Sequence, residues 1–127
     1  MRFKGWVIAA SLLIVLALGG VSLVHVGHVS EVMLDQLDQV REAVSRSDWQ
    51  GAVARANTLH DDWHHRRTWL QLFISHRDTD AVDMTLVRLI AALNAQDPIG
   101  TAREIADADT SLRNLPSREK PAIYNVL

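Results

Sequence analysis

The chain has 127 residues with 13 basic and 15 acidic side chains, for a formal net charge of −2 with neutral histidines. This length allows one domain, and the interspersed signs of charge argue against a nucleic-acid partner, because phosphate binding needs a clustered basic face. The absence of cysteine excludes a disulfide framework, a thiol nucleophile and a thiolate zinc site.

A strongly apolar run opens the chain. Residues 6–24, WVIAASLLIVLALGGVSLV, include 19 positions without a charge. As a helix rising about 1.5 Å per residue, this run matches the roughly 30 Å hydrocarbon core of a bilayer. Arg2 and Lys4 precede it, and the next Arg or Lys is Arg41. We therefore predict a single-pass plasma-membrane anchor with a cytoplasmic N-terminus and an extracytoplasmic C-terminal domain.

A cleavable signal peptide is the alternative for this run. A basic start, an apolar stretch and small residues near Ala17, Gly19 and Gly20 fit a peptidase site. Apolar residues continue past that point to Val26, which a signal peptide does not need. We expect an uncleaved anchor and a mature chain that retains Trp6.

The chain is therefore expected to have two parts: residues 1–28 as basic start and transmembrane anchor, and residues 29–127 as a single extracytoplasmic helical bundle. The second part has apolar residues at the spacings of amphipathic helices. We predict an all-α fold, with a transmembrane helix followed by about four antiparallel helices in two hairpins. The predicted core positions are Val29, Met33, Leu37, Val40, Val44; Trp49, Ala52, Val53, Ala56, Leu59, Trp63, Leu70, Ile74; Val82, Leu86, Leu89, Ile90, Leu93; and Ile99, Ala102, Ile105, Ala106, Leu112.

Turn signals separate these helices. Ser47 or Asp48 is the expected N-cap of the second helix, and residues 75–80, SHRDTD, are the expected connection to the third. Asp97 and Pro98 close the third helix, and Pro116 ends the fourth. The apolar tail, AIYNVL at residues 122–127, is expected to dock on the bundle.

A short pattern recurs 49 residues along the chain, with three apolar positions before a turn aspartate. Two stacked helical hairpins would produce it, and simple bundle periodicity explains it as well. The matched residues are Leu37, Val40, Val44 and Asp48, and Leu86, Leu89, Leu93 and Asp97.

Two histidines suggest a metal site. His60 and His64 are four residues apart and share a helical face, the spacing by which two imidazoles reach one zinc ion. A third ligand is required, with Asp61, His65 or His76 as candidates. The segment HDDWH lacks the glutamate of the H-E-x-x-H signature. We therefore expect no metal or other cofactor. We expect these histidines to lie beside the core-facing stripe, in contact with solvent.

Other polar residues can be interpreted either as structural or as functional. Asp61 and Asp62 precede Arg66 and Arg67 at spacings that support a helix, and the same charges are a candidate docking patch. His76 is expected beyond the end of the second helix, as a structural cap. Two more histidines, His25 and His28, lie where the span should leave the bilayer, and their protonation there is a conceivable pH switch.

The segment WLQLFI is apolar most of the way round a helix. Trp69 and Leu72 point away from the predicted core stripe, so a third layer or a partner should cover them. We take Trp69, Leu72, Arg66 and Arg67 as candidate interaction residues.

Several short motifs together resemble the bacterial membrane proteins of the family named domain of unknown function 4363. The resemblance extends over nearly the whole chain and implies a membrane-anchored helical architecture, but no reaction and no catalytic residue. The motifs are DWQGA at 48–52, Trp63, FISH at 73–76, LVRL at 86–89 and YNVL at 124–127.

These patterns favour a membrane-anchored protein-interaction or scaffolding module whose partner is another membrane or envelope protein. The alternative is a metal-binding or pH-responsive extracytoplasmic sensor that uses His60, His64 and His76. We expect no enzyme, because the sequence has no nucleophile elbow and no phosphate-binding glycine loop.

Overall fold

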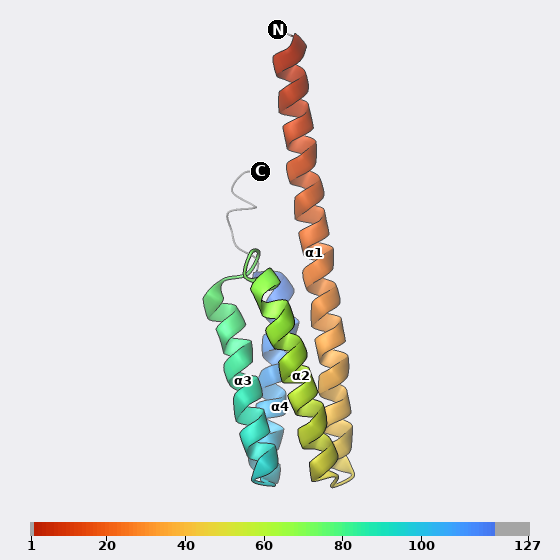
Figure 1. The fold of residues 1–127 in the computed structure, drawn as a ribbon, viewed down its shortest axis with the longest axis vertical. Coiled ribbons are helices and arrows are strands. Elements are labelled where there is room, and N and C mark those ends of the chain that lie inside the picture. The colour runs from red at the N-terminus through yellow and green to blue at the C-terminus, as the bar shows by residue number, and fades with distance from the viewer. Residues whose placement is uncertain (1, 119–127) are drawn as a thin grey trace.

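The computed structural model is an antiparallel bundle of four helices in which the first helix is much longer than the others (Figure 1). The structure describes residues 2–118, without the side chains at 2, 3, 19, 21–24, 117 and 118. The all-α fold predicted from the sequence is confirmed. The elements are α1 (Arg2–Ser45), α2 (Trp49–Leu70), α3 (His76–Asn94), α4 (Pro98–Asn114) and the short 3-10 helix η1 (Leu115–Arg118).

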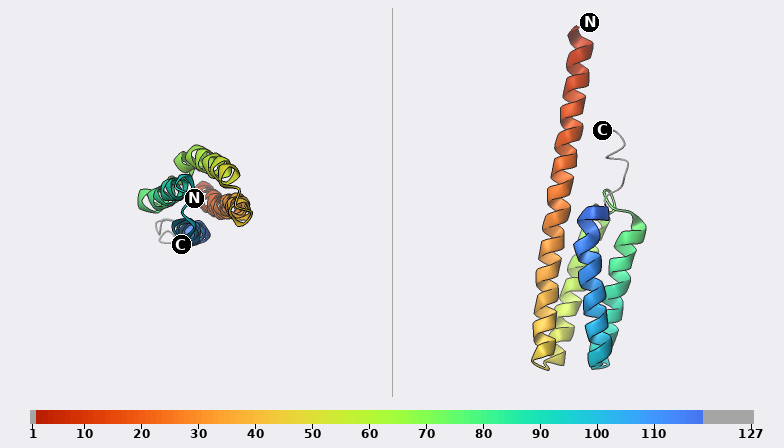
Figure 2. Two further views of the ribbon diagram at one scale, coloured as in Figure 1. Left: turned by 90° about the horizontal axis from the view of Figure 1, so that it is seen from below. Right: turned by 180° about the vertical axis from the view of Figure 1, so that it is seen from behind.

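Helix α1 runs without a break through the predicted boundary at residues 28 and 29, and its N-terminal half extends beyond the other helices (Figures 1 and 2). The large apolar side chains described between Trp6 and Leu18 are exposed. Among the described residues, no helix combines the length and the apolar character that crossing a bilayer requires. The structure thus confirms a helix at residues 6–24, and the membrane span stays a prediction.

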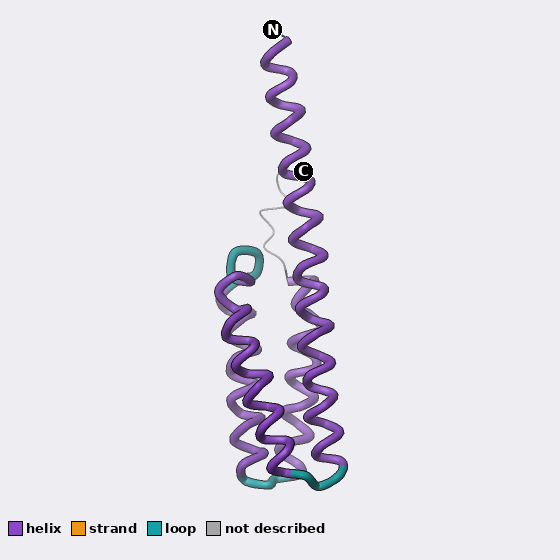
Figure 3. Tube along the Cα trace, turned by 45° about the vertical axis from the view of Figure 1, so that its right-hand side comes forward, coloured by secondary structure: helices purple, strands orange, loops and turns teal. Residues whose placement is uncertain are grey.

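The bundle is formed by the C-terminal half of α1 and by α2, α3 and α4. Helix α1 packs against α2 and α4, and α3 closes the ring by packing against the same two helices (Figure 2, left). The α1–α2 and α3–α4 turns lie together at one end of the bundle, and the α2–α3 connection lies at the other (Figure 3). The predicted pair of helical hairpins is therefore confirmed.

The two hairpin turns share one construction. Each has a residue in the left-handed region, followed by an N-cap aspartate whose Oδ1 accepts a hydrogen bond from the backbone N–H three residues later. The repeat in the sequence thus has a counterpart in the two turns. The paired residues are Ser47 and Gln96 (φ 57° and 51°), Asp48 and Asp97, and Gly51 and Gly100 (N–H to Oδ1 2.9 and 3.0 Å).

The core confirms most of the apolar stripes predicted for the first three helices. Trp63 is fully buried, whereas Trp49, Val53, Val44 and Ile90 are partly buried at its edge. The confirmed core positions are Val29, Met33, Leu37, Val40, Ala52, Ala56, Leu59, Leu70, Ile74, Val82, Leu86, Leu89 and Leu93.

The predicted face of the fourth helix is partly wrong. Ile99 is 79% exposed, and Ala102 and Ala106 are exposed as well. Ile105 and Leu112 are buried as predicted, and the remaining buried positions are small or polar: Gly100, Thr101 and Ala108. Ile99 stands at the second position of the helix, at the hairpin end, where no neighbouring helix covers it. The predicted docking of the tail at 122–127 lies outside the described residues.

The connection between α2 and α3 is shorter than predicted and lies earlier. Ser75 is the N-cap of α3, and its side chain accepts a hydrogen bond from the N–H of Asp78. Residues 76–80 therefore belong to the helix. His76 is the first residue of α3, so its predicted place in the connection between the second and third helices is wrong, because the hydroxyl of Ser75 already caps α3.

A buried hydrogen bond joins the first and last helices of the bundle. Ser30 Oγ of α1 donates to the carbonyl oxygen of Leu112 near the end of α4, at 2.7 Å. Helix α1 passes through both Gly27 and Ser30 without a break. The bond fixes α1 to the bundle near the point where it continues alone.

Candidate functional site

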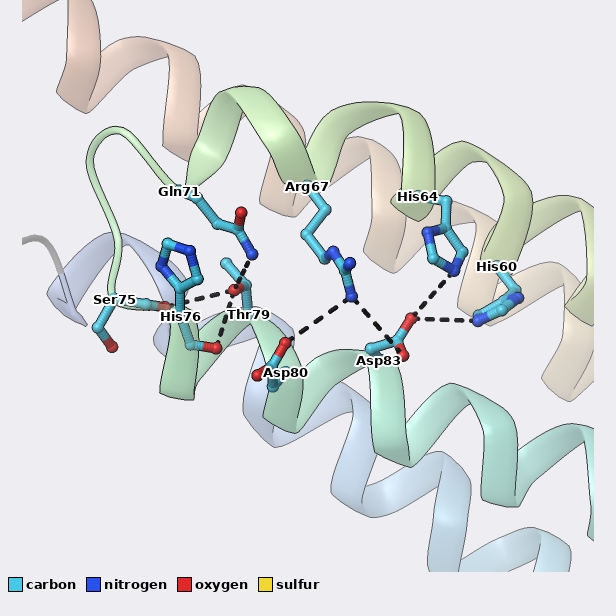
Figure 4. A network of polar contacts seen from close by, with 9 residues as sticks. All are labelled: His60, His64, Arg67, Gln71, Ser75, His76, Thr79, Asp80 and Asp83. Carbon is cyan, nitrogen blue, oxygen red and sulfur yellow. Dashed lines mark hydrogen bonds and ion pairs between the residues drawn. The ribbon is translucent and has the colours of Figure 1, made fainter.

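A cluster of polar side chains joins α2 to α3 (Figure 4). His60 and His64 stand on neighbouring turns of α2, and Asp83 of α3 lies opposite both. The Oδ1 atom of Asp83 is 3.2 Å from Nε2 of His60 and 3.6 Å from Nε2 of His64. The two imidazole rings meet edge to face with centroids 4.9 Å apart. We name these three residues the His–His–Asp cluster.

Arg67 of α2 approaches the same carboxylate from its other side. Its Nη1 lies 3.9 Å from Oδ2 of Asp83 and 3.7 Å from Oδ1 of Asp80. Asp83 therefore presents one oxygen to the histidines and the other to the guanidinium group (Figure 4). Such a set can link two helices by hydrogen bonds and ion pairs, or offer three ligand atoms to a cation.

The third member of the cluster differs from every candidate named from the sequence. His76 begins α3 and lies apart from the other two histidines, two turns before Asp83 (Figure 4). His65 turns its Nδ1 toward the carbonyl oxygen of Asp61 on its own helix, at 2.7 Å. No local motif marks Asp83, because only the packing of α3 on α2 brings it to the histidines.

Of the charge pairs predicted within the second helix, the one between Asp62 and Arg66 is confirmed. The Nε of Arg66 donates to Oδ1 of Asp62 at 3.0 Å, and Gln36 of α1 donates to Oδ2 of the same aspartate at 2.9 Å. Arg67 instead pairs with α3. Both arginines thus have partners inside the bundle, and their role in docking stays a prediction.

Apolar side chains gather at the end of α2 and in the turn after it, where Trp69 and Leu72 are exposed and Phe73 is partly buried. Trp69 is 54% exposed and Leu72 is 61% exposed, in agreement with their predicted direction away from the core. The ring of Trp69 contacts His25 of α1 and Phe73 edge to face, with centroids 6.2 and 6.0 Å apart. We name Trp69, Leu72 and Phe73 the end patch. It lies at the end of the bundle from which α1 continues alone (Figure 1).

The family model described as "Domain of unknown function (DUF4363)" matches residues 21–126 of the chain. The chain belongs to the DUF4363 family. The resemblance noted from the sequence motifs is therefore confirmed. No curated protein and no solved structure matches the chain.

The DUF4363 match includes both the His–His–Asp cluster and the end patch. It begins inside the apolar run, at residue 21, and so includes little of the part of α1 that extends beyond the bundle. The family match therefore covers the bundle. The membrane and bacterial aspects of the resemblance stay predictions.

Proposed function

We propose that this DUF4363 protein is a single-pass protein of the bacterial plasma membrane whose bundle is an extracytoplasmic interaction or scaffolding module. The uncharged run at residues 6–24 and the exposed apolar side chains of α1 support the anchor. Apolar surface left in water costs about 25 cal/mol per Å², and a bilayer would remove that cost. Arg2 and Lys4 favour a cytoplasmic N-terminus.

The observation that carries the interaction function is the end patch. Trp69 and Leu72 are exposed beside the point where α1 leaves the bundle, so a partner that covers them lies close to the membrane. Aromatic residues and arginine are enriched among the side chains that dominate binding energy. Arg66 stands three residues before Trp69 on the same side of α2 and supplies a polar rim. A membrane or envelope protein fits this position.

The His–His–Asp cluster favours a second candidate function, a metal-binding or pH-responsive sensor. His60 and His64 share one carboxylate oxygen on another helix, so binding of a cation or a proton there would change the contact between α2 and α3. In this proposal and in the first, the bundle catalyses no reaction.

Site-specific photo-crosslinking in native membranes tests the interaction function. A photoreactive phenylalanine analogue replaces Leu72 in the full-length protein, and a matched control replaces the exposed Val87 of α3. We expect one discrete adduct from position 72 that is lost when Trp69→Ala is added, and no such adduct from position 87.

Equal amounts of adduct from both positions would show that crosslinking at position 72 is non-specific. No adduct at position 72 would contradict the proposal. Circular dichroism of the Trp69→Ala variant provides the control for folding, because loss of helicity would make Trp69 part of the core.

A further inference from the structure

We propose that His60, His64 and Asp83 bind a divalent transition-metal ion, with Zn²⁺ the best match, between α2 and α3. This inference rests on the second candidate function above and names its ligands and its ion. The site involves neither the anchor nor the end patch, so its failure would leave the interaction function untouched. Two of its ligands belong to one helix and the third to the next. Metal binding would therefore join the second half of α2 to the middle of α3.

Two of the three separations between the ligand atoms are close to those of tetrahedral coordination. Zinc bonds of about 2.0 to 2.2 Å to nitrogen and oxygen place neighbouring ligands about 3.3 to 3.6 Å apart. Asp83 Oδ1 lies 3.2 Å from Nε2 of His60 and 3.6 Å from Nε2 of His64. The three atoms all lie within 4.8 Å of one another. Small rotations of the side chains bring all three within bonding distance of one ion.

The surroundings hold these ligands in place. The i and i+4 spacing puts the two imidazoles on one face of α2. Arg67 lies near Oδ2 of Asp83, so that Oδ1 is left for the metal. A partner of this kind orients a coordinating carboxylate and is itself important for metal affinity.

The charges around the cluster suit a cation. With neutral imidazoles, Asp80 and Asp83 contribute two negative charges and Arg67 one positive charge, which leaves a net negative site. In the metal-free chain, Nε2 of His60 lies within hydrogen-bond distance of Oδ1 of Asp83, at 3.2 Å, whereas Nε2 of His64 is farther away, at 3.6 Å. Zn²⁺ would bind the Nε2 lone pair of each neutral imidazole, and the single ring hydrogen would then be on Nδ1.

The ligand types and their exposure indicate which ion binds and how. Imidazole suits zinc, copper and nickel, whereas Mg²⁺ and Ca²⁺ prefer oxygen ligands alone. Three protein ligands leave a fourth position for water or for a group from a partner. The side chain of His64 is 48% exposed, so this position faces solvent.

Calorimetric titration of the chelator-treated, full-length protein in detergent micelles tests the site. We expect one Zn²⁺ per chain in the wild type and no binding of Mg²⁺. His64→Ala and Asp83→Asn should each weaken zinc binding at least about tenfold, since even the loss of a group that only orients a ligand costs that much. His65→Ala is the matched control, because this neighbouring exposed histidine lies outside the cluster and should leave the affinity unchanged.

Two further measurements do not rely on the heat of binding. Co²⁺ in place of Zn²⁺ should give the visible absorption of a tetrahedral site in the wild type and in His65→Ala, but not in His64→Ala. Zinc should raise the melting temperature of the wild type, because an ion that binds only the folded state stabilises it.

Equal zinc affinity in the wild type and in His64→Ala would overturn the proposal, as would the absence of binding at millimolar zinc. The His64→Ala variant decides the matter even if Asp83→Asn fails to fold, because a half-exposed histidine can be removed without opening the core.

Discussion

Trp69 at the end of α2 meets His25 of α1 edge to face, with ring centroids 6.2 Å apart. The residue that follows His25, Val26, is the first buried side chain described along α1. The contact therefore marks the point where α1 enters the core, and it ties the end patch to that point.

The end patch should contribute little to the stability of the isolated chain. Because Trp69 and Leu72 are more than half exposed, we expect Trp69→Ala and Leu72→Ala each to lower the free energy of unfolding by less than about 1 kcal/mol. Thermal unfolding followed by circular dichroism measures this. A loss of several kcal/mol would mean that these side chains serve as core.

Trp63 should behave in the opposite way. Trp63→Ala empties a fully buried site and should cost about 3 to 5 kcal/mol. Trp63→Phe should cost far less, because Nε1 of Trp63 is buried without a hydrogen-bond partner among the described residues. Removing that N–H recovers about 1 to 3 kcal/mol of desolvation cost, which offsets the lost contacts. Urea unfolding of both variants checks the difference, and equal losses would show that Nε1 is satisfied in solution.

The cap of α2 and its glycine should be thermodynamically coupled. A Cβ on Gly51 would stand 2.2 Å from Oδ2 of Asp48, so Gly51→Ala forces the cap side chain to move. We expect the loss of the cap, about 1 kcal/mol, to cancel the higher helix propensity of alanine, which is of similar size.

With Asp48→Ala already present, Gly51→Ala should instead stabilise the chain, because only the gain in propensity remains. A double-mutant cycle followed by thermal unfolding measures this coupling. Asp97 and Gly100 should give the same sign, since a Cβ on Gly100 stands 2.3 Å from Oδ2 of Asp97. Additive effects at both turns would contradict the prediction.

The bond between Ser30 and the carbonyl of Leu112 should stabilise the packing of α1 on α4. Ser30→Ala removes a buried hydrogen bond, and we expect a loss of about 1 kcal/mol. Ser45→Ala is the control, because its hydroxyl donates to the carbonyl of Glu42 at an exposed site and its loss should be within about 0.5 kcal/mol. Equal effects in the two variants would show that burial of the Ser30 bond has no energetic consequence.

The sequence predicted what depends on local periodicity and capping. The stripe from Val29 to Val40 and the cap at Asp48 depend on neighbouring residues, and the structure confirms both. The buried face of α4 was harder to predict, because alanine and threonine occur on both faces of this helix and do not distinguish the core side. Ile99 was wrongly predicted as a core residue, because at the start of α4 it has no neighbouring helix to pack against.

The candidate sites also include features that local sequence predicted and features that depend on how the helices pack. The exposure of Trp69 and Leu72 was predicted from helical geometry, although α2 ends at Leu70 and Leu72 lies in the turn that follows. The pairing of Asp83 with His60 and His64 depends on the register between two helices, which no spacing within either helix reveals. His76 was chosen by residue type alone, and the cap at Ser75 places it away from the cluster.

The proposed topology is tested most directly by single-cysteine labelling, which the absence of natural cysteine makes possible. Gly5→Cys marks the N-terminal end, where the backbone has open space, and Ile99→Cys marks the exposed hairpin end. In bacterial spheroplasts treated with a membrane-impermeant maleimide, the account predicts labelling at position 99 and protection at position 5 until the membrane is permeabilised. Protection at position 99 with labelling at position 5, or recovery of both variants in the soluble fraction, would contradict it.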